Sequence, residues 1–430
     1  MKSNVKVVPK EYLFPFVLIT SLFALWGFAN DITNPMVAAF KTVMEISNAK
    51  AALVQFAFYG GYATMAIPAA LVIKRYSYKM GIIIGLSLYA VGALLFFPAA
   101  QFELFGFFLV SLYILTFGLA FLETTANPYI LSMGPVETAT RRLNLAQSFN
   151  PMGSIFGMFI ASNVILTALE SDKRDAAGNL IFDTLSVAER AAVRTHDLGV
   201  IRDPYVMLGF FVILMLVIIA VSKMPKRGKA DHSIRTKDTF RRLAKNKKYR
   251  EGVIAQVFYV GAQIMCWTFI IQYADNLGIP KAEAQRYNIV AMAIFIGSRF
   301  VSTFLMKYLN ARFMLTFFAV GGMLTTTGVI LIEGMPGLYL LIATSAFMSL
   351  MFPTIYGIAL EGLGEDSTLG AAGLVMAIVG GALMPPLQGV IIDQGTVGWL
   401  PAVNFSFVLP FICFVVIAIY GYRTMKIYHQ

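Results

Sequence analysis

The chain has 430 residues, of which 58% are hydrophobic and only 13% are charged, and its formal net charge is +11. Soluble domains carry about 25% charged residues, so this composition excludes an ordinary water-soluble protein and predicts an integral membrane protein. A basic excess by itself would also fit nucleic-acid binding, but the distribution of the charges along the chain gives a different explanation.

Twelve apolar segments follow one another, each long enough to cross a bilayer. Spanning takes roughly 20 mostly apolar residues, and in hydrocarbon every backbone polar group must be satisfied within its segment, which predicts helices. The first segment is too long for a cleaved signal sequence and no small-x-small cleavage site follows it, so we expect it to remain as helix 1. The expected spans are 12–40, 52–73, 80–100, 104–131, 144–169, 203–222, 251–275, 287–306, 313–332, 336–360, 370–392 and 401–422.

The spans form two sets of six, separated by a basic segment. Lys223–Arg250 holds twelve Lys and Arg residues against two Asp residues. We expect residues 1–222 to form one six-helix bundle, 223–250 a basic cytoplasmic linker and 251–430 a second bundle. A weak internal repeat, in which Trp26 of helix 1 corresponds to Trp267 of helix 7, supports pseudo-symmetric halves. This all-α polytopic organisation is typical of transporters that bind substrate near the midplane, between the halves.

The basic residues favour one topology. With both termini and the linker in the cytoplasm, the inside segments carry 24 of the 34 Lys and Arg residues and the outside loops carry nine. This bias fits the positive-inside rule, so the net charge of +11 is explained by topology and by attraction to anionic lipid, and it needs no nucleic-acid partner. The outside segment Glu170–Asp203 is expected to be a solvated loop with one short helix near Leu185–Arg194.

Helix 1 contains a polar stripe. Asp31 and Asn34 are three residues apart, Asn30 and Asn34 are four apart, and Pro35 follows as a helix breaker. A carboxylate at a helix centre costs roughly 2.5–3.5 kcal/mol on insertion scales, so such residues tend to be functional. The alternative for Asp31 is a cap at the outer end of the helix.

Helix 4 contains the other carboxylate that lies well inside a span. Glu123 and Asn127 are four residues apart and share a face, and Pro128 can kink the helix beside them. We interpret Glu123 as functional, and the alternative is a structural group bonded to a neighbouring helix.

Amides and aromatic residues recur at helical spacing in three further spans. Helix 5 carries Gln147, Asn150 and Ser154 on one face, and its Gly153 and Gly157 suit close helix packing. Further candidates are Tyr259, Gln263 and Trp267 in helix 7, and Phe352 and Tyr356 in helix 10. Amides and acids can bind many hydroxyl groups while aromatic faces cover C–H patches, which together predict a sugar site. An anionic substrate would need basic residues in the cavity, and the spans offer only Arg299.

Coupling to an ion would depend on the two acids. His196, His232 and His429 all fall in expected loops or at the terminus, and Cys266 and Cys413 are expected to be buried apolar side chains without a disulfide or metal. Burial disfavours the charged form of a carboxyl group, so Asp31 or Glu123 could take up a proton on one side and release it on the other. A proton moving down about 100 mV supplies roughly 2.3 kcal/mol, enough for about fiftyfold accumulation. Sodium could use the same carboxylates.

The chain resembles the fucose/proton symporter branch of the major facilitator superfamily over nearly its whole length. The resembling stretches are LETTANPYI (Leu122–Ile130), RLNLAQSFN (Arg142–Asn150), YVGAQIMCW (Tyr259–Trp267), AFMSLMFPTIY (Ala346–Tyr356) and Gly380–Gly389. The resemblance implies the twelve-helix fold, import of a monosaccharide with a proton, and alternating access. It also implies substrate recognition by Glu123 and sugar contact by Gln147 and Asn150.

Two positions depart from the family pattern. The family's helix 1 aspartate, which is tied to proton coupling, falls on Asn34, and the nearest acid here is Asp31, about one turn earlier. We expect Asp31 to take over this role. A tyrosine of the family's sugar site falls on Phe352, so one hydroxyl group is lost there. Because of this loss, a related hexose is an alternative to L-fucose as the substrate.

These observations lead to a proton-coupled monosaccharide symporter that is not an enzyme, needs no cofactor or metal and acts as a monomer. Asp31 and Glu123 are the expected proton-coupling residues. The expected substrate-binding residues are Asn30, Asn34, Glu123, Asn127, Gln147, Asn150, Tyr259, Gln263, Trp267, Phe352, Tyr356 and Gln388. The alternatives are a sodium-coupled or uniport sugar transporter and a membrane sugar sensor on the same fold.

Overall fold

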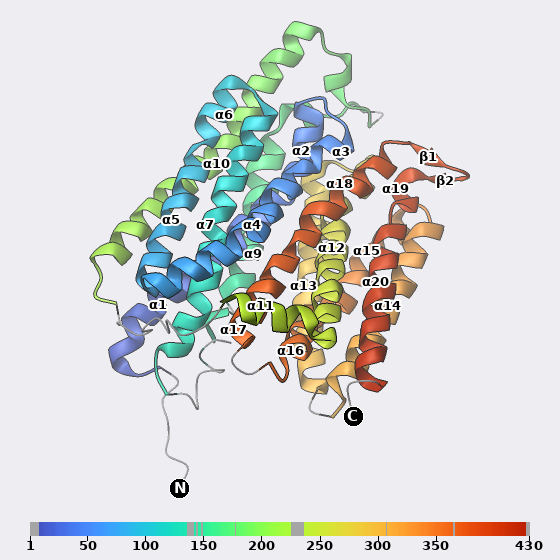
Figure 1. Cartoon of the computed structure of the whole chain (residues 1–430). Helices are drawn as coiled ribbons and strands as arrows, with labels where there is room; N and C mark the ends of the chain where they lie inside the picture. Colours follow the sequence, from blue (N-terminus) through green and yellow to red (C-terminus); the bar gives the residue numbers. More distant parts are fainter. Residues whose placement is uncertain are drawn as a thin grey trace.

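The computed structural model describes residues 8–135, 142, 145–147, 149–176, 178–224, 236–306, 308–363 and 366–426. Two groups of long helices stand side by side, α1 to α10 in one and α12 to α20 in the other (Figure 1). The start of α1 and the end of α20 lie at the same end of the molecule, which we call the terminal end. The short helices α2 and α3 lie at the other end, which we call the opposite end.

The first half contains six membrane-crossing segments, some built from more than one helix. In chain order they are η1 (Lys10–Tyr12), α1 (Leu13–Thr33) and α2 (Met36–Val43); α3 (Asn48–Ala51) and α4 (Leu53–Arg75); α5 (Tyr78–Leu94) and α6 (Phe96–Phe102); α7 (Phe105–Ser132); α9 (Phe149–Ile160), the π-helical turn η3 (Ala161–Ile165) and η4 (Leu166–Ala168); and α10 (Val187–Val221). Two 3-10 turns, η5 (Glu170–Asp172) and η6 (Ile181–Thr184), connect the fifth and sixth segments.

The second half repeats this number of segments after a short helix, α11 (Thr236–Lys245). Its segments are α12 (Lys247–Asn276); α13 (Lys281–Leu305); α14 (Ala311–Leu331); α15 (Met335–Met348) and α16 (Met351–Leu360); α17 (Ser367–Met376), η8 (Ala377–Val379) and α18 (Gly380–Ile392); and α19 (Ala402–Phe405) and α20 (Val408–Lys426). The strands β1 (Thr396–Val397) and β2 (Leu400–Pro401) pair antiparallel before α19.

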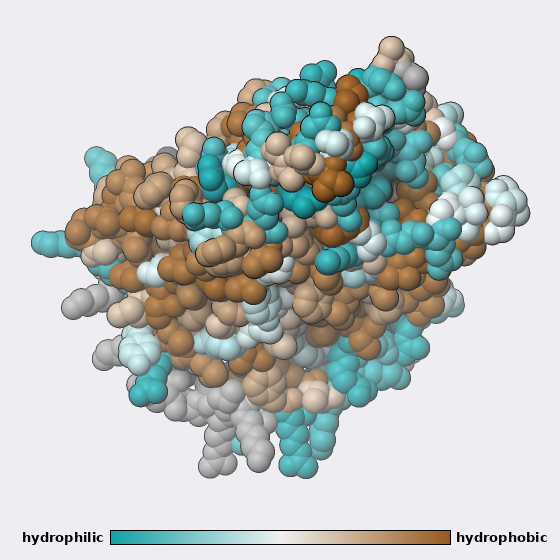
Figure 2. Space-filling view, turned by 90° about the horizontal axis from the view of Figure 1, so that it is seen from above, coloured by the Kyte–Doolittle hydropathy of each residue, from teal (hydrophilic) through white to brown (hydrophobic). Residues whose placement is uncertain are grey.

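Eleven helical segments of the described chain are long and apolar enough to cross a membrane. The twelfth expected span coincides with α13, whose 25 residues suffice in length but include Glu283, Arg286 and Arg299. The view onto the opposite end shows hydrophilic side chains gathered on part of that end, beside broad hydrophobic surfaces (Figure 2). The twelve-helix all-α fold predicted from the sequence is therefore confirmed.

The prediction for the segment before the sixth span was right about a helix near Leu185–Arg194 but wrong about its extent. This helix is not separate: it is the start of α10 (Val187–Val221), which runs for 35 residues and contains Pro204. At 1.5 Å per residue it is about 53 Å long, well beyond the roughly 30 Å of hydrocarbon. Ser186 starts it with a reciprocal capping box to Glu189, and His196 lies within the helix and not in a loop.

Several predicted spans are also interrupted. Span 1 breaks after Thr33 and resumes at Met36, span 10 breaks between Met348 and Met351, and span 11 contains the 3-10 turn η8. By contrast, α7 continues without a break through the position of Pro128. Broken helices in membrane proteins are tolerated where protein or a cavity surrounds them.

The predicted basic linker is described only in part, because residues 225–235 lie outside the described ranges. Its later part forms α11 and, from Lys247, the start of α12. The Arg242 guanidinium binds both carboxylate oxygens of Asp366 over 2.8 and 2.6 Å. This contact holds α11 against the start of α17. Cys266 and Cys413 are buried and free, as expected from the sequence.

Candidate functional site

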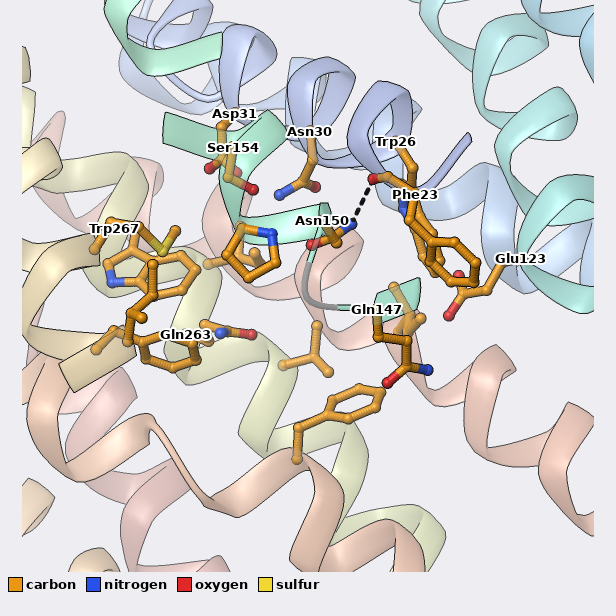
Figure 3. A pocket seen from close by; sticks show the side chains of 18 of the residues that line it. Phe23, Trp26, Asn30, Asp31, Glu123, Gln147, Asn150, Ser154, Gln263 and Trp267 are labelled. Carbon is orange, nitrogen blue, oxygen red and sulfur yellow. Dashed lines mark hydrogen bonds between the residues drawn. The ribbon is translucent and has the colours of Figure 1, made fainter. Parts of the chain in front are cut away.

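A cavity of about 310 Å³ lies between the two halves. The first half lines it from α1, α4, α7 and α9, and the second half from α12, α13, η8 and α16 (Figure 3). Its polar lining residues are Asn30, Asp31, Tyr59, Tyr62, Glu123, Asn127, Gln147, Asn150, Ser154, Gln263 and Arg299. The apolar ones are Phe23, Trp26, Pro151, Val260, Ile264, Trp267, Met292, Phe295, Ile296, Phe352 and Ile378.

Glycine contacts between α1 and α9 position one wall of the cavity. A β-carbon on Gly153 would lie 1.9 Å from the backbone oxygen of Ala24, so the two helix backbones approach more closely than any larger side chain allows. This confirms the close packing predicted from Gly153 and Gly157. The side-chain amide of Asn150 donates to the backbone oxygen of Phe23 over 3.3 Å. Asn150 and Ser154 are thereby fixed beside the polar stripe of α1.

Asp31 is a wall residue and not an outer-end cap. Its side chain is buried, and its Oδ1 accepts a hydrogen bond from Asn34 Nδ2 over 3.1 Å. Asn34 Oδ1 in turn accepts from Gln55 Nε2 over 3.1 Å. Asn30 and Ser154 lie close to the Asp31 carboxyl group (Figure 3). The carboxyl group therefore lies among neutral hydrogen-bonding side chains, an environment in which a proton can be bound or released without breaking an ion pair.

Glu123 reaches the cavity from α7. Its side chain is 9% exposed, and its Oε2 has no hydrogen-bond partner among the described residues. One turn further on, Asn127 Nδ2 donates to the backbone oxygen of Glu123 over 3.1 Å, and Asn127 Oδ1 accepts from Gln147 Nε2 over 3.0 Å. A buried carboxyl oxygen without a partner is costly, so a proton or a donor group of a ligand would be well accommodated there.

The second half supplies an aromatic wall. Trp267 lies edge-on to Phe295 with ring centroids 5.0 Å apart, and its Nε1 donates to Ser345 Oγ over 3.1 Å. Phe352 also lines the cavity and stacks on Tyr356. Arg299 donates from Nε to the backbone oxygen of Ser349 over 3.0 Å, and its guanidinium lies 4.7 Å from the centre of the Phe295 ring. Both acids of the cavity wall therefore come from the first half, and Arg299, its cation, comes from the second.

Nine of the thirteen residues expected at the site line the cavity: Asn30, Asp31, Glu123, Asn127, Gln147, Asn150, Gln263, Trp267 and Phe352. The other four, Asn34, Tyr259, Tyr356 and Gln388, do not. Asn34 bonds to Asp31, Tyr259 donates to the backbone oxygen of Met348 over 3.0 Å, and Gln388 donates to Ser406 Oγ over 3.0 Å. The direct substrate contact that we expected for these four residues stays a prediction.

Four polar wall residues were not assigned to the site from the sequence: Tyr59, Tyr62, Ser154 and Arg299. Tyr59 and Tyr62 come from α4, and the Tyr59 hydroxyl donates to Asn30 Oδ1 over 2.8 Å. Gln55 and Tyr59 lie four residues apart, which is the same helical spacing that identified the candidates in helix 7. Arg299 was recognised as an intramembrane cation but was not assigned to the site.

A polytopic helical protein with a polar cavity between two six-helix halves is a membrane transporter by its architecture. The family model described as Major Facilitator Superfamily matches residues 17–379. The chain is 72% identical to the "L-fucose-proton symporter" of Haemophilus influenzae, with 99% of both chains covered. It is 35% identical to the "L-fucose-proton symporter" of Escherichia coli, with 96% of this chain and 93% of that protein covered.

The solved structure of the transporter FucP, described as being in the outward conformation, matches with a TM-score of 0.71 and 34% identity. The match covers 96% of this chain and 99% of FucP. The chain belongs to the Major Facilitator Superfamily, in its fucose/proton symporter branch, and is thus a transporter and not an enzyme.

Proposed function

We propose that this protein is a proton-coupled symporter that imports L-fucose or a closely related hexose by alternating access. The observation that carries the proposal is the cavity between the halves, where two buried carboxyl groups lie among side-chain amides and aromatic rings. The 72% identity to a protein named L-fucose-proton symporter supports the same function.

The cavity chemistry suits a monosaccharide. Ligand pockets range from about 300 to 1,000 Å³, so a cavity of about 310 Å³ favours a small substrate. Asn127, Gln147, Asn150 and Gln263 offer amide donors and acceptors to hydroxyl groups. Trp267 and Phe352, which are apolar, would cover the C–H faces of the sugar ring.

Proton coupling is assigned to Asp31 and Glu123. Both carboxyl groups are buried at the cavity wall, and neither takes part in an ion pair among the described residues. When a proton neutralises such a carboxyl group, the group can move from a more hydrated to a less hydrated state at a lower cost in free energy. When the loaded cavity then opens to the other side of the membrane, it would release the proton and the sugar together.

The orientation follows from charge and from the shared position of the chain ends. We assign the terminal end, which carries the basic helix α11, to the cytoplasm of a bacterial cell and place the protein in the inner membrane (Figure 1). We further propose that the protein works as a monomer. Its two halves are residues 1–222 and 251–430, joined by the linker 223–250.

Proteoliposomes test the function directly. Purified protein would be given a panel of labelled monosaccharides with an imposed proton gradient, with a sodium gradient or with neither. We expect L-fucose or a related hexose to accumulate only with the proton gradient and to exchange by counterflow without one. Accumulation with sodium alone would favour a sodium symporter, and binding without counterflow would favour a sensor.

A further inference from the structure

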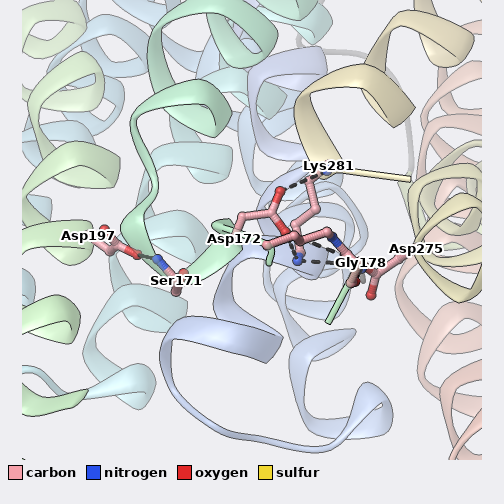
Figure 4. A network of polar contacts seen from close by, with 7 residues as sticks. Ser171, Asp172, Gly178, Asp197, Asp275 and Lys281 are labelled. Carbon is pink, nitrogen blue, oxygen red and sulfur yellow. Dashed lines mark hydrogen bonds and ion pairs between the residues drawn. The ribbon is translucent and has the colours of Figure 1, made fainter. Parts of the chain in front are cut away.

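Four charged side chains from both halves meet at the opposite end of the molecule, away from the cavity (Figure 4). Asp172, at the end of η5, and Arg174 belong to the first half. Asp275, near the end of α12, and Lys281, the first residue of α13, belong to the second half. Each half therefore contributes one acid and one base.

The closest ion pairs cross between the halves. Lys281 Nζ lies 2.7 Å from Asp172 Oδ1, and the backbone nitrogen of Lys281 donates to Asp172 Oδ2 over 2.8 Å. Arg174 Nη2 forms the second crossed pair with Asp275 Oδ1. The side chains of Lys281 and Asp172 are only 1% and 6% exposed, so these contacts exclude water from the junction.

Each charge also has an opposite charge from its own half nearby. Arg174 Nη2 lies 4.0 Å from Asp172 Oδ1, and Lys281 Nζ lies 3.8 Å from Asp275 Oδ1. When the halves move apart, Asp172 can pair with Arg174 and Asp275 can pair with Lys281. No charge is then left without a partner, whereas breaking a simple buried ion pair leaves both charges uncompensated.

The acid of the first half is held by a fixed support. The backbone nitrogens of Glu170 and Ser171 donate to the two carboxylate oxygens of Asp197, each over 2.9 Å. Asp197 is fully buried on α10. This clamp fixes η5 to the first half, so a movement of that half carries Asp172 with it.

A second contact between the halves lies at the same end. Asp393, just after α18, accepts hydrogen bonds from the backbone nitrogens of Asn48 and Ala49 over 2.8 and 2.9 Å, and from Asn48 Nδ2 over 2.7 Å. The opposite end is therefore closed at two separate places.

We propose that Asp172, Arg174, Asp275 and Lys281 form a partner-exchanging latch that controls the opening of the opposite end. With that end closed, the ion pairs cross between the halves. When it opens, each acid pairs with the base of its own half, which keeps the two states close in free energy. The role of the latch in transport rests on the proposed function, but the latch itself is a statement about conformation.

Distances between spin labels test the latch independently of transport. Labels would be attached at Lys50→Cys and Thr396→Cys, which are exposed positions of the two halves at the opposite end. Cys266 and Cys413 are buried and can be retained. The distance distribution would be measured for the parent, for Lys281→Met, for Asp172→Asn and for the conservative variant Lys281→Arg.

We expect Lys281→Met and Asp172→Asn to raise the ratio of the longer to the shorter distance roughly tenfold, and Lys281→Arg to stay near the parent. The matched control is Lys173→Met, because Lys173 is exposed and pairs with Glu170 of its own half. That variant should leave the distribution unchanged. An unchanged distribution in Lys281→Met and Asp172→Asn, both monodisperse on size exclusion, would overturn the latch.

The exchanged variant Asp172→Lys with Lys281→Asp separates partner exchange from a simple ion pair. It keeps an attractive crossed pair, but each half then holds two like charges, beside Arg174 and beside Asp275. Partner exchange predicts that the shorter distance dominates more than in the parent, and a longer distance would contradict it. If the distances respond as expected while sugar uptake is absent, the latch stands and the proposed transport function fails.

Discussion

A β-carbon on Gly27 would lie 2.0 Å from the backbone oxygen of Asn150, so α1 and α9 touch at the very turn that supplies cavity residues from both helices. Asn150 lines the cavity on one side of this contact and Asn30 on the other. The geometry of the cavity wall in the first half therefore depends on Gly27, which has no polar side chain.

Gly27→Ala is expected to destabilise the protein and to weaken sugar binding, because the helices must separate to admit the methyl group. Overpacking of this kind costs about 1–3 kcal/mol. The melting temperature in detergent and the apparent sugar affinity would both fall. Gly297→Ala is the matched control, since a β-carbon at that position in α13 meets nothing within 4 Å. Equal behaviour of the two variants would mean that the close contact does not constrain the site.

Tyr59→Phe tests a wall residue that the sequence did not reveal. The change removes the hydroxyl donor to Asn30 Oδ1, so the amide loses its orientation without any loss of ring packing. A hydrogen bond of this kind contributes about 0.5–1.5 kcal/mol, which corresponds to a roughly two- to tenfold weaker apparent sugar affinity. Tyr113→Phe is the control, because that hydroxyl donates to Thr64 and lies outside the cavity wall. A parent-like affinity in Tyr59→Phe would remove this residue from the site.

The stability of the protein is expected to depend on pH through Glu361, which lies at the terminal end. Its hydrogen bond to Lys248, assisted by Arg312, lowers the pKa of this carboxyl group below its ordinary value. A lowered pKa in the folded state contributes stability above the ordinary value, near 4.5, and this stability is lost as the pH falls through the folded-state pKa. The melting temperature should therefore fall from pH 6 to pH 4, and less so in Glu361→Gln. Glu333→Gln, at an exposed carboxyl group outside every ion pair of the described residues, should behave like the parent.

The spans could be predicted from the sequence because lipid imposes one rule on every segment, namely a long apolar helix. A helix near Leu185–Arg194 was predicted, but its continuity with the sixth span was not, because the charged residues between the two resemble a loop. The capping box of Ser186 and Glu189 marks where this helix begins. Short breaks, such as that after Thr33, change backbone geometry without changing hydropathy, so hydropathy could not reveal them.

The candidate site could be predicted only as far as helical spacing allows. Spacing shows that Tyr259 and Gln263 share a face of α12, but it does not show how far along the helix the cavity reaches. In the structure Gln263 lines the cavity, whereas the Tyr259 hydroxyl donates a hydrogen bond to the backbone oxygen of Met348. Tyr59 was missed because aromatic residues inside spans are more often packing residues, and only its bond to Asn30 distinguishes it.

Asp31→Asn addresses the coupling role expected for helix 1. The amide preserves the shape of the side chain and can keep a hydrogen bond with Asn34, but it cannot bind and release a proton. We expect counterflow of labelled sugar to persist within about tenfold of the parent, and accumulation driven by a proton gradient to be lost. Measuring both in the same proteoliposome preparation separates coupling from folding. Accumulation at the parent level would show that Asp31 does not couple transport to the proton.

Glu123→Gln separates the two acids. Glu123 Oε2 and Asp31 Oδ2 are both buried without a hydrogen-bond partner among the described residues. The two groups still face different environments, because Asp31 Oδ1 accepts from Asn34 and has Asn30 and Ser154 beside it. If Glu123 binds both the sugar and the proton, its replacement by an amide should weaken sugar binding about tenfold or more and make the remaining binding independent of pH. Binding would be measured by calorimetry between pH 5 and 8, with Asp31→Asn alongside. A parent-like pH dependence in Glu123→Gln would leave Asp31 as the sole candidate for proton binding among the two, because no other carboxyl group lines the described cavity.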